Sequence, residues 1–171
     1  MISEKFAKAL SDQVNAEYYS AYLYLVMSAA ADKMGLKGTA SWLFVQAQEE
    51  MAHGTHIYEY ILERDATPEF APIALPPVEF DNITAIFREV QAHEAKVTQL
   101  INNLATIAMQ DFDHAGYQFM TWYVGEQVEE EASVKLVLDK LHWIADNTGQ
   151  LLNLDAELGT RVFVNPFPAK A

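Results

Sequence analysis

The sequence predicts an all-α fold: a four-helix bundle with one long crossover connection and a short fifth helix at the C-terminus. Four long stretches carry apolar residues at the three-and-four spacing of a helical face that is buried on one side. A tight joint separates the first two stretches, and a proline-bearing segment of about fifteen residues separates the second from the third. With 171 residues, 51% of them hydrophobic, we expect residues 1–171 to form a single domain with a substantial core.

The first two helices are expected to be antiparallel because the joint between them is short. Ser3 is expected to cap the first helix, which ends at Gly35, and the second runs from about Lys37 to Asp65, ahead of Pro68. The buried face of the first helix comprises Phe6, Leu10, Glu17, Ala21 and Tyr24, and that of the second Leu43, Ala47, Glu50, His53, Ile57 and Ile61. Both faces therefore include acidic side chains among apolar ones.

The segment 66–80 contains Pro68, Pro72, Pro76 and Pro77, and we interpret it as an extended connection within the domain. Fully extended, it would reach roughly 50 Å. A thirty-residue helix is roughly 45 Å long. The segment can therefore cross the full length of the bundle, which would make the second and third helices parallel.

The third helix is expected to be capped by Asp81 and to run to about Met109. After a short break at 110–113, the fourth runs to about Trp143, and a short fifth helix covers 147–158, closed by Gly159. The third helix has the clearest apolar face, formed by Ile83, Phe87, Val90, Glu94, Val97, Ile101, Leu104 and Ala108. The corresponding face of the fourth comprises Phe119, Tyr123, Gln127, Glu130, Val134, Val137 and Leu141.

Each apolar face is interrupted near its midpoint by a carboxylate, and these four are Glu17, Glu50, Glu94 and Glu130. A buried ionised carboxylate must be paired, hydrogen-bonded or bound to a metal, and the basic residues lie off these faces. Residues at mid-helix share one layer of a bundle whichever way each helix runs. His53 follows Glu50 by three residues and so lies on the same face. Such a layer could hold two metal ions bridged by Glu50, and its donors suit iron or manganese better than copper or structural zinc.

A further acidic group could hold another cation beside this layer. Glu126, Glu129 and Glu130 share one side of the fourth helix, and Glu49 directly precedes Glu50 on the second. A solvated acidic face is the alternative interpretation of these residues. We therefore predict a third cation site at Glu49, Glu126 and Glu129, looser than the central pair.

Two other polar features have both a structural and a functional interpretation. Tyr24, two turns after Glu17, could be a core aromatic residue or a hydrogen-bond donor to a metal ligand. Asp111, Asp113 and His114, in the turn between the third and fourth helices, could line an iron-access pore at a symmetry axis. Helix capping and solvation is the more ordinary role for these three residues.

Composition excludes several classes of function. A net charge of −13 leaves no basic stripe to neutralise phosphates, so we expect no nucleic-acid partner. The longest uncharged apolar run, 18–31, is too short to span a bilayer, and the N-terminus lacks the pattern of a signal peptide. The absence of cysteine rules out thiolate metal sites and fits a reducing compartment. We therefore expect a cytoplasmic protein without a membrane partner.

These residues resemble the ferritin superfamily, and most closely the bacterial non-haem ferritins, over essentially the whole chain. The shared motifs are Glu17, Tyr24, Glu49-Glu50-x-x-His53, Glu94 and Glu126-Gln127-x-Glu129-Glu130. The resemblance implies a ferroxidase centre in which Glu17, Glu50 and His53 hold the first iron. It implies that Glu50, Glu94 and Glu130 hold the second iron. The extra iron site of prokaryotic ferritins would be formed by Glu49, Glu126, Glu129 and Glu130. Gln127 is a further candidate metal residue, and Gln127 and Tyr24 complete the candidate catalytic residues.

The resemblance also implies a hollow homo-oligomeric shell of 24 chains that oxidises Fe(II) with O2 or H2O2 and stores the product as a ferric mineral. Bacterioferritins and many di-iron oxygenases carry a second Glu-x-x-His on the last bundle helix, where this chain has Gln127 and Glu130. This departure favours a site through which iron passes. Met51 stands at the position of the haem methionine of bacterioferritins, but methionine on a helix is more often a packing residue, and we expect no haem.

Two alternatives to a storage protein remain open from the sequence. The first is a small di-iron peroxidase of the rubrerythrin kind, although this chain has no cysteine-rich rubredoxin tail. The second is a purely structural helical bundle whose buried glutamates are protonated or paired with lysine.

Overall fold

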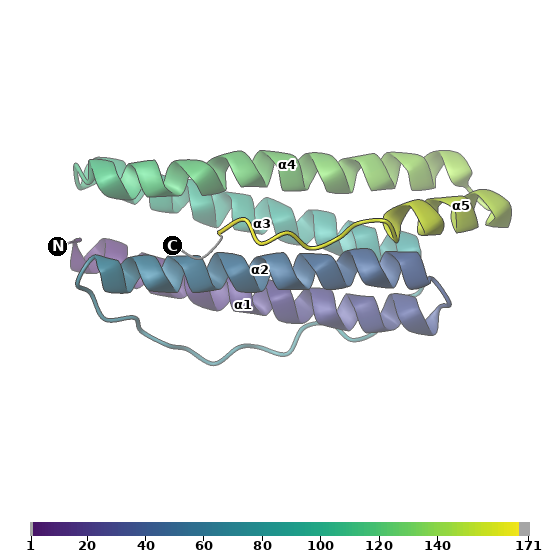
Figure 1. Cartoon of the computed structure of the whole chain (residues 1–171), viewed down its shortest axis with the longest axis horizontal. Coiled ribbons are helices and arrows are strands. Elements are labelled where there is room, and N and C mark those ends of the chain that lie inside the picture. Colours follow the sequence, from purple (N-terminus) through teal and green to yellow (C-terminus); the bar gives the residue numbers. More distant parts are fainter. Residues whose placement is uncertain (1, 168–171) are drawn as a thin grey trace.

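The computed structural model describes residues 2–167, which contain five α-helices and no strand. The helices are α1 (Glu4–Lys33), α2 (Lys37–Glu63), α3 (Ile83–Gln110), α4 (His114–Ile144) and α5 (Thr148–Leu158). The four long helices lie alongside one another, and α5 packs at one end of the bundle (Figure 1). The predicted all-α bundle with a short fifth helix is confirmed. No helix among the described residues is both long and apolar enough to cross a membrane.

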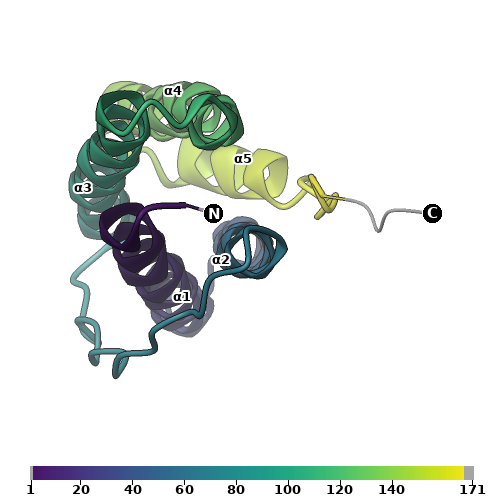
Figure 2. The same cartoon turned by 90° about the vertical axis from the view of Figure 1, so that its left-hand side faces the viewer.

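The connection between α2 and α3 is the predicted long crossover. It runs outside the bundle from one end to the other, so α2 and α3 point the same way (Figures 1 and 2). Two side chains of α1 hold it in place. The Asn15 amide donates to the carbonyl oxygen of Ala71 at 2.9 Å, and the Ser11 hydroxyl accepts from the Glu69 N–H at 3.1 Å.

The helix ends agree with the sequence within one or two residues, with one changed cap. Asn82, and not Asp81 as expected, is the N-cap of α3: its side-chain oxygen accepts from the Ala85 N–H at 2.9 Å. Aspartate and asparagine cap equally well, so two such residues in a row leave the start uncertain by one position. Ser3 caps α1 as expected, by accepting from the Phe6 N–H at 3.0 Å.

The start of α2 is capped by a residue from α5. Leu36 at the N-cap position provides no side-chain hydrogen bond. The Asp155 carboxylate instead accepts from the N–H groups of Gly38 and Thr39 at 3.0 and 2.7 Å, and from the Thr39 hydroxyl at 2.8 Å. A Cβ atom on Gly38 would lie 1.7 Å from the Asp155 carbonyl oxygen, so the two backbones touch. This contact fixes where the chain leaves α5.

Replacing Gly38 with alanine should therefore push α5 off α2. The loss of the cap and the steric strain together should cost about 2–4 kcal/mol. We expect a clearly lower melting temperature in a thermal denaturation measurement. Gly125→Ala on α4 is the matched control, because a Cβ there meets no atom within 4 Å and alanine is the better helix former. Equal melting temperatures for Gly38→Ala and the parent protein would contradict this account of the contact.

The hydrophobic core of the described residues forms two clusters, one at each end of the bundle. The cluster at the α5 end includes Leu23, Met27, Leu43, Phe87 and Val134. The other includes Phe6, Leu10, Ile57, Ile101 and Met120. Between them, each long helix contributes buried polar residues near its midpoint. The polar layer lies where the apolar periodicity is interrupted.

Candidate metal centre

Five buried ionisable residues form this layer, each at most 4% exposed: Glu17, Glu50, His53, Glu94 and Glu130. Glu17 on α1 and Glu50 and His53 on α2 each offer a ligand atom, and these atoms lie within 4.8 Å of one another. His53 Nδ1 is 3.4 Å from Glu50 Oε2. Among residues 2–167, this is the one group of three or more such side chains close enough to bind a common ion.

Two atoms of this group have no hydrogen-bond partner among the described residues. They are Glu17 Oε2 and His53 Nε2, and both are buried. A buried polar atom without a partner costs free energy that folding must offset. A cation bound between these carboxylates and the Nδ1 side of His53 would supply the missing partner of Glu17 Oε2, so these residues fit a metal ion.

The other half of the layer is built around Glu94 on α3. The Tyr24 hydroxyl of α1 donates to Glu94 Oε1 at 2.5 Å, and the Gln127 amide of α4 donates to Glu94 Oε2 at 3.2 Å. Tyr24 is thus both a fully buried core aromatic and a donor to a candidate ligand. Gln127, one of the candidate metal residues, is placed as a hydrogen-bond partner of Glu94.

Two glutamines that were not predicted from the sequence orient two of the other carboxylates. Gln13 donates to Glu17 Oε1 at 2.8 Å, and Gln46 donates to Glu130 Oε2 at 2.9 Å. Gln13 and Glu17 are four residues apart on one helix, a spacing that would have suggested the contact. The Gln46 contact joins α2 to α4, so no local spacing predicts it.

Burial raises the pKa of every carboxyl group in the layer. It raises the pKa of Glu17 and Glu50 well above the usual value, and neighbouring carboxylates add to the effect. Burial, followed by the charge of Glu94, raises the pKa of Glu130 to about 7. The metal-free centre therefore retains protons near neutral pH, and a bound cation would displace them.

Aromatic side chains surround His53 on the α4 side. The ring centroids of Trp122 and Tyr123 lie 5.4 and 5.9 Å from that of His53, both nearly edge-on. The Tyr123 hydroxyl donates to the His53 carbonyl oxygen at 3.2 Å. The Phe167 ring lies 6.1 Å from the His53 ring, although it is 114 residues further along the chain. These contacts hold the imidazole in one orientation.

The predicted third cation site is only partly brought together. Burial raises the pKa of Glu49, and the nearby charge of Glu126 adds to this. Glu129 is exposed on α4. Arg161, which the sequence analysis did not consider, forms an ion pair with Glu49 at 2.5 Å. The third site stays a prediction, and its first ligand is paired with a basic side chain.

Two of the three polar residues in the turn between α3 and α4 form structural hydrogen bonds, and the access pore stays a prediction. The Asp113 carboxylate accepts from the Gly116 N–H at 3.0 Å as the cap of α4, and it pairs with Arg64 at 3.0 Å. Asp111 accepts from the Ser3 hydroxyl at 2.5 Å. His114 is exposed at the first position of α4. These bonds tie the start of α1 and the end of α2 to the turn.

Comparison with known proteins gives one consistent result. The model of the family described as ferritin-like domain matches residues 7–144. The chain is 40% identical to a bacterial non-heme ferritin of Staphylococcus aureus over 163 residues, which cover 95% of this chain and 98% of the relative. A bacterial non-heme ferritin of Staphylococcus haemolyticus is 39% identical over the same length.

Solved structures of ferritins also match the fold of this chain. An open-pore ferritin from the hyperthermophilic archaeon Archaeoglobus fulgidus matches with a TM-score of 0.93 at 45% identity, over 95% of this chain and 100% of that one. A closed form of that ferritin, engineered by site-directed mutagenesis, matches with a TM-score of 0.94 at 45% identity, over 96% of this chain and 100% of the other.

Proposed function

Since the chain belongs to the ferritin family, we propose that it is an iron-storage ferritin with ferroxidase activity. It takes up Fe(II), oxidises it with dioxygen or hydrogen peroxide in the centre of the bundle, and stores Fe(III) as a mineral inside a shell of 24 copies. The supporting observation is the buried layer of four glutamates and one histidine, in which atoms of Glu17 and His53 lack partners.

Two iron ions are bound as substrate in this proposal. Glu17, Glu50 and His53 hold the first, because their ligand atoms lie within 4.8 Å of one another. Glu50, Glu94 and Glu130 hold the second, and Glu50 bridges the two. The charges of Glu94 and Glu130 both raise the pKa of Glu50, in keeping with three carboxylates around a shared space.

The iron supplies the redox chemistry, and the chain supplies positions and protons. Two Fe(II) ions each give one electron to a dioxygen molecule, which takes up two protons and leaves as hydrogen peroxide. With hydrogen peroxide as the oxidant, two electrons and two protons yield two water molecules. Carboxyl groups such as Glu130, whose pKa is raised to about 7, release protons when iron binds and so provide them locally.

The residues of α4 favour a centre through which iron passes over a centre that keeps iron as a permanent cofactor. Where a second histidine would add a strong neutral ligand, the chain has Gln127, whose amide donates to Glu94, and Glu130. With a single histidine, the centre has fewer nitrogen donors with which to retain iron as a permanent cofactor. The proposed third site at Glu49, Glu126 and Glu129 would be the next position on the way to the mineral.

A shell requires contacts between chains, and the surface offers apolar area for them. Exposed apolar and aromatic side chains occur on α1, α2 and the crossover: Tyr22, Leu25, Phe44, Met51, Phe70, Ile73 and Leu75. Apolar groups exposed in such number favour burial against other chains. The charge of −13 per chain would concentrate iron within the assembly, which we place in the cytoplasm.

A sizing column tests the proposal directly. Metal-free protein is mixed with excess Fe(II) in air and then fractionated, while iron and protein are followed together. We expect iron far above two ions per chain to elute with a very large particle. About two ions per chain on a small particle would contradict storage and favour a di-iron enzyme of the rubrerythrin kind.

A further inference from the structure

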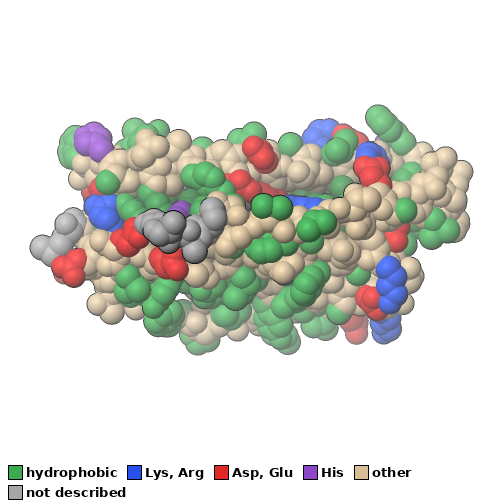
Figure 3. All heavy atoms as spheres, viewed as in Figure 1, with side chains coloured by type: hydrophobic (Ala, Val, Ile, Leu, Met, Phe, Trp, Pro, Cys, Tyr) green, Lys and Arg blue, Asp and Glu red, His purple; other side chains and the backbone are tan. Residues whose placement is uncertain are grey.

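The side of the bundle between α2 and α4 is not closed by helix packing. Within the described helices, no Cα atom of α2 lies within 8 Å of one in α4. Residues 159–167, which we call the C-terminal strap, leave α5 and run back along this side (Figures 1 and 2). In the space-filling view from the same direction, acidic and basic atoms lie recessed between the two helices (Figure 3). The strap covers the α2–α4 side of the metal centre.

Arg161 at the start of the strap reaches into this side. Its guanidinium group pairs with Glu49 at 2.5 Å and lies 4.8 Å from the centroid of the Trp42 ring. Its positive charge also lowers the pKa of Glu130, against the larger effect of burial. One cationic side chain thus acts on Glu49, a ligand of the proposed third iron, and on Glu130, a ligand of the second.

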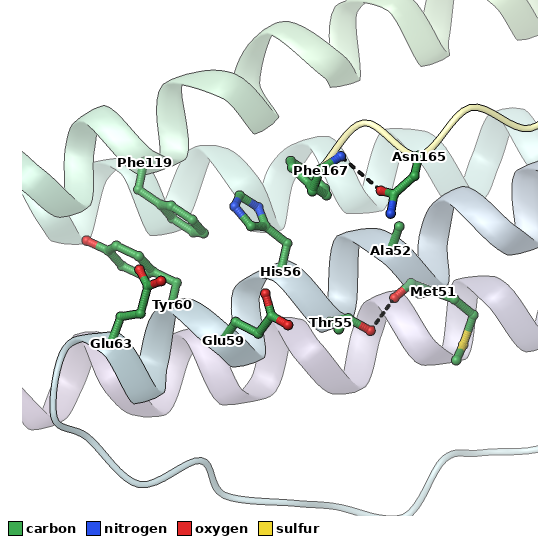
Figure 4. Close-up of a pocket in the computed structure, with 10 residues that line it drawn as sticks. All are labelled: Met51, Ala52, Thr55, His56, Glu59, Tyr60, Glu63, Phe119, Asn165 and Phe167. Carbon is green, nitrogen blue, oxygen red and sulfur yellow. Dashed lines mark hydrogen bonds between the residues drawn. The ribbon is translucent and has the colours of Figure 1, made fainter. Parts of the chain in front are cut away.

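The other end of the strap is held by aromatic packing. The Phe167 ring stacks on His56 with centroids 3.7 Å apart and lies 4.5 Å from the centroid of Trp122. Phe167 and His56 both line a surface pocket that is also lined by Glu59 and Phe119 (Figure 4). The strap is therefore attached at both ends, by α5 and by this aromatic cluster.

We propose that Arg161 is a built-in counter-cation that occupies the place of the third iron and sets the order in which iron positions fill. Iron fills the two buried positions first, because their ligands include atoms without hydrogen-bond partners. The third position becomes available only when the Arg161 side chain leaves Glu49. This inference rests on the proposed function. Arg161 acts through Glu49 to control the order in which iron positions fill.

The structure makes this exchange feasible. Asp155 anchors α5 to the start of α2, so the backbone near Arg161 stays in place while its long side chain can turn. Arg161 is partly exposed, and an ion pair that water can reach is held weakly. A divalent cation at Glu49 and Glu126 would compete with a single positive charge. The exchange of Arg161 for a cation leaves the ligands of the two buried iron positions in place.

The test compares Arg161→Gln with the parent protein by anaerobic calorimetric titration with Fe(II). Arg161→Lys keeps the charge. Lys140→Gln is the matched control, because it also removes one positive charge but Lys140 forms its ion pair with Glu157 of α5 instead of Glu49. We expect two tight binding events per chain in every variant. The third event should tighten at least about tenfold in Arg161→Gln alone, because a competing charge is removed.

A second comparison separates charge from structure. The gain in Arg161→Gln should disappear when Glu49→Gln is added, because the ligand that Arg161 covers is then lost. An equal third event in Arg161→Gln and the parent protein would overturn the inference while leaving the two tight events, and with them the proposed function, intact. Absence of the two tight events from the parent protein would instead contradict the proposed function itself.

Discussion

Replacing Glu50 with alanine should abolish rapid oxidation of Fe(II) while the assembled particle survives. Glu50 lies between the residues of both iron positions: its ligand atom is close to those of Glu17 and His53, and the charges of Glu94 and Glu130 act on it. Losing the bridge removes a ligand from both ions at once. Because the loss of even a residue that supports a metal ligand costs about 10–100-fold, we expect initial oxidation to fall on the order of 100-fold or more.

The same substitution separates a catalytic centre from a structural one. Glu50 is buried among carboxylates, and its pKa is raised well above the usual value by burial and by Glu94. Removing such a group relieves repulsion among buried carboxylates, so the metal-free variant should melt no lower than the parent at neutral pH. Glu59→Ala, an exposed site on the same helix, loses the same charge and is the control.

Stopped-flow absorbance after addition of two Fe(II) per chain in air measures the oxidation, and a sizing column checks the assembly. An unchanged rate of Fe(II) oxidation in Glu50→Ala would contradict the assignment of the ferroxidase centre to this layer. Slow oxidation in the Glu59→Ala control as well would show that net charge, and not the layer, governs the rate.

The layer could be predicted from the sequence because a glutamate lies on the buried face of each long helix. Apolar residues at helical spacing fix which face of each helix is buried, and a glutamate on each such face then has to be buried too. The lengths of the helices and of the crossover place these residues at one level. Glu17, Glu50, His53, Glu94 and Glu130 follow from that reasoning, and the structure places them in the interior.

The contacts that the sequence did not reveal are those made between distant segments. Asp155 caps the start of α2 by accepting from Gly38, 117 residues earlier, and no local pattern links the two residues. Arg161 and Phe167 lie after the last periodic segment, so nothing in their spacing indicates which face they cover. Asp81 and Asn82 are equivalent caps by residue type, and only the backbone geometry of the α3 start distinguishes them.

The metal-free protein should lose stability as the pH rises from about 5 to about 8. A carboxyl group with a higher pKa in the folded than in the unfolded chain binds its proton more tightly when folded. Its contribution is complete below the usual value of 4.5 and is lost as the pH passes the folded value, which for Glu130 is about 7. A shift of this size corresponds to on the order of 3 kcal/mol, and the raised pKa values of Glu17 and Glu50 act in the same direction.

A divalent cation should reverse this loss, because it takes the place of the protons that leave the carboxyl groups. Zn(II) is the probe, since it does not change its oxidation state. We expect the rise in melting temperature on adding Zn(II) to be larger at about pH 8 than at about pH 5, where bound protons compete. Glu130→Gln provides the reference, because its neutral amide removes one titrating group from the layer. A stability difference between the metal-free parent and Glu130→Gln that stays constant from pH 5 to pH 8 would show that Glu130 does not titrate in this range. The proposed exchange of the Glu130 proton for a bound cation in this pH range would then be contradicted.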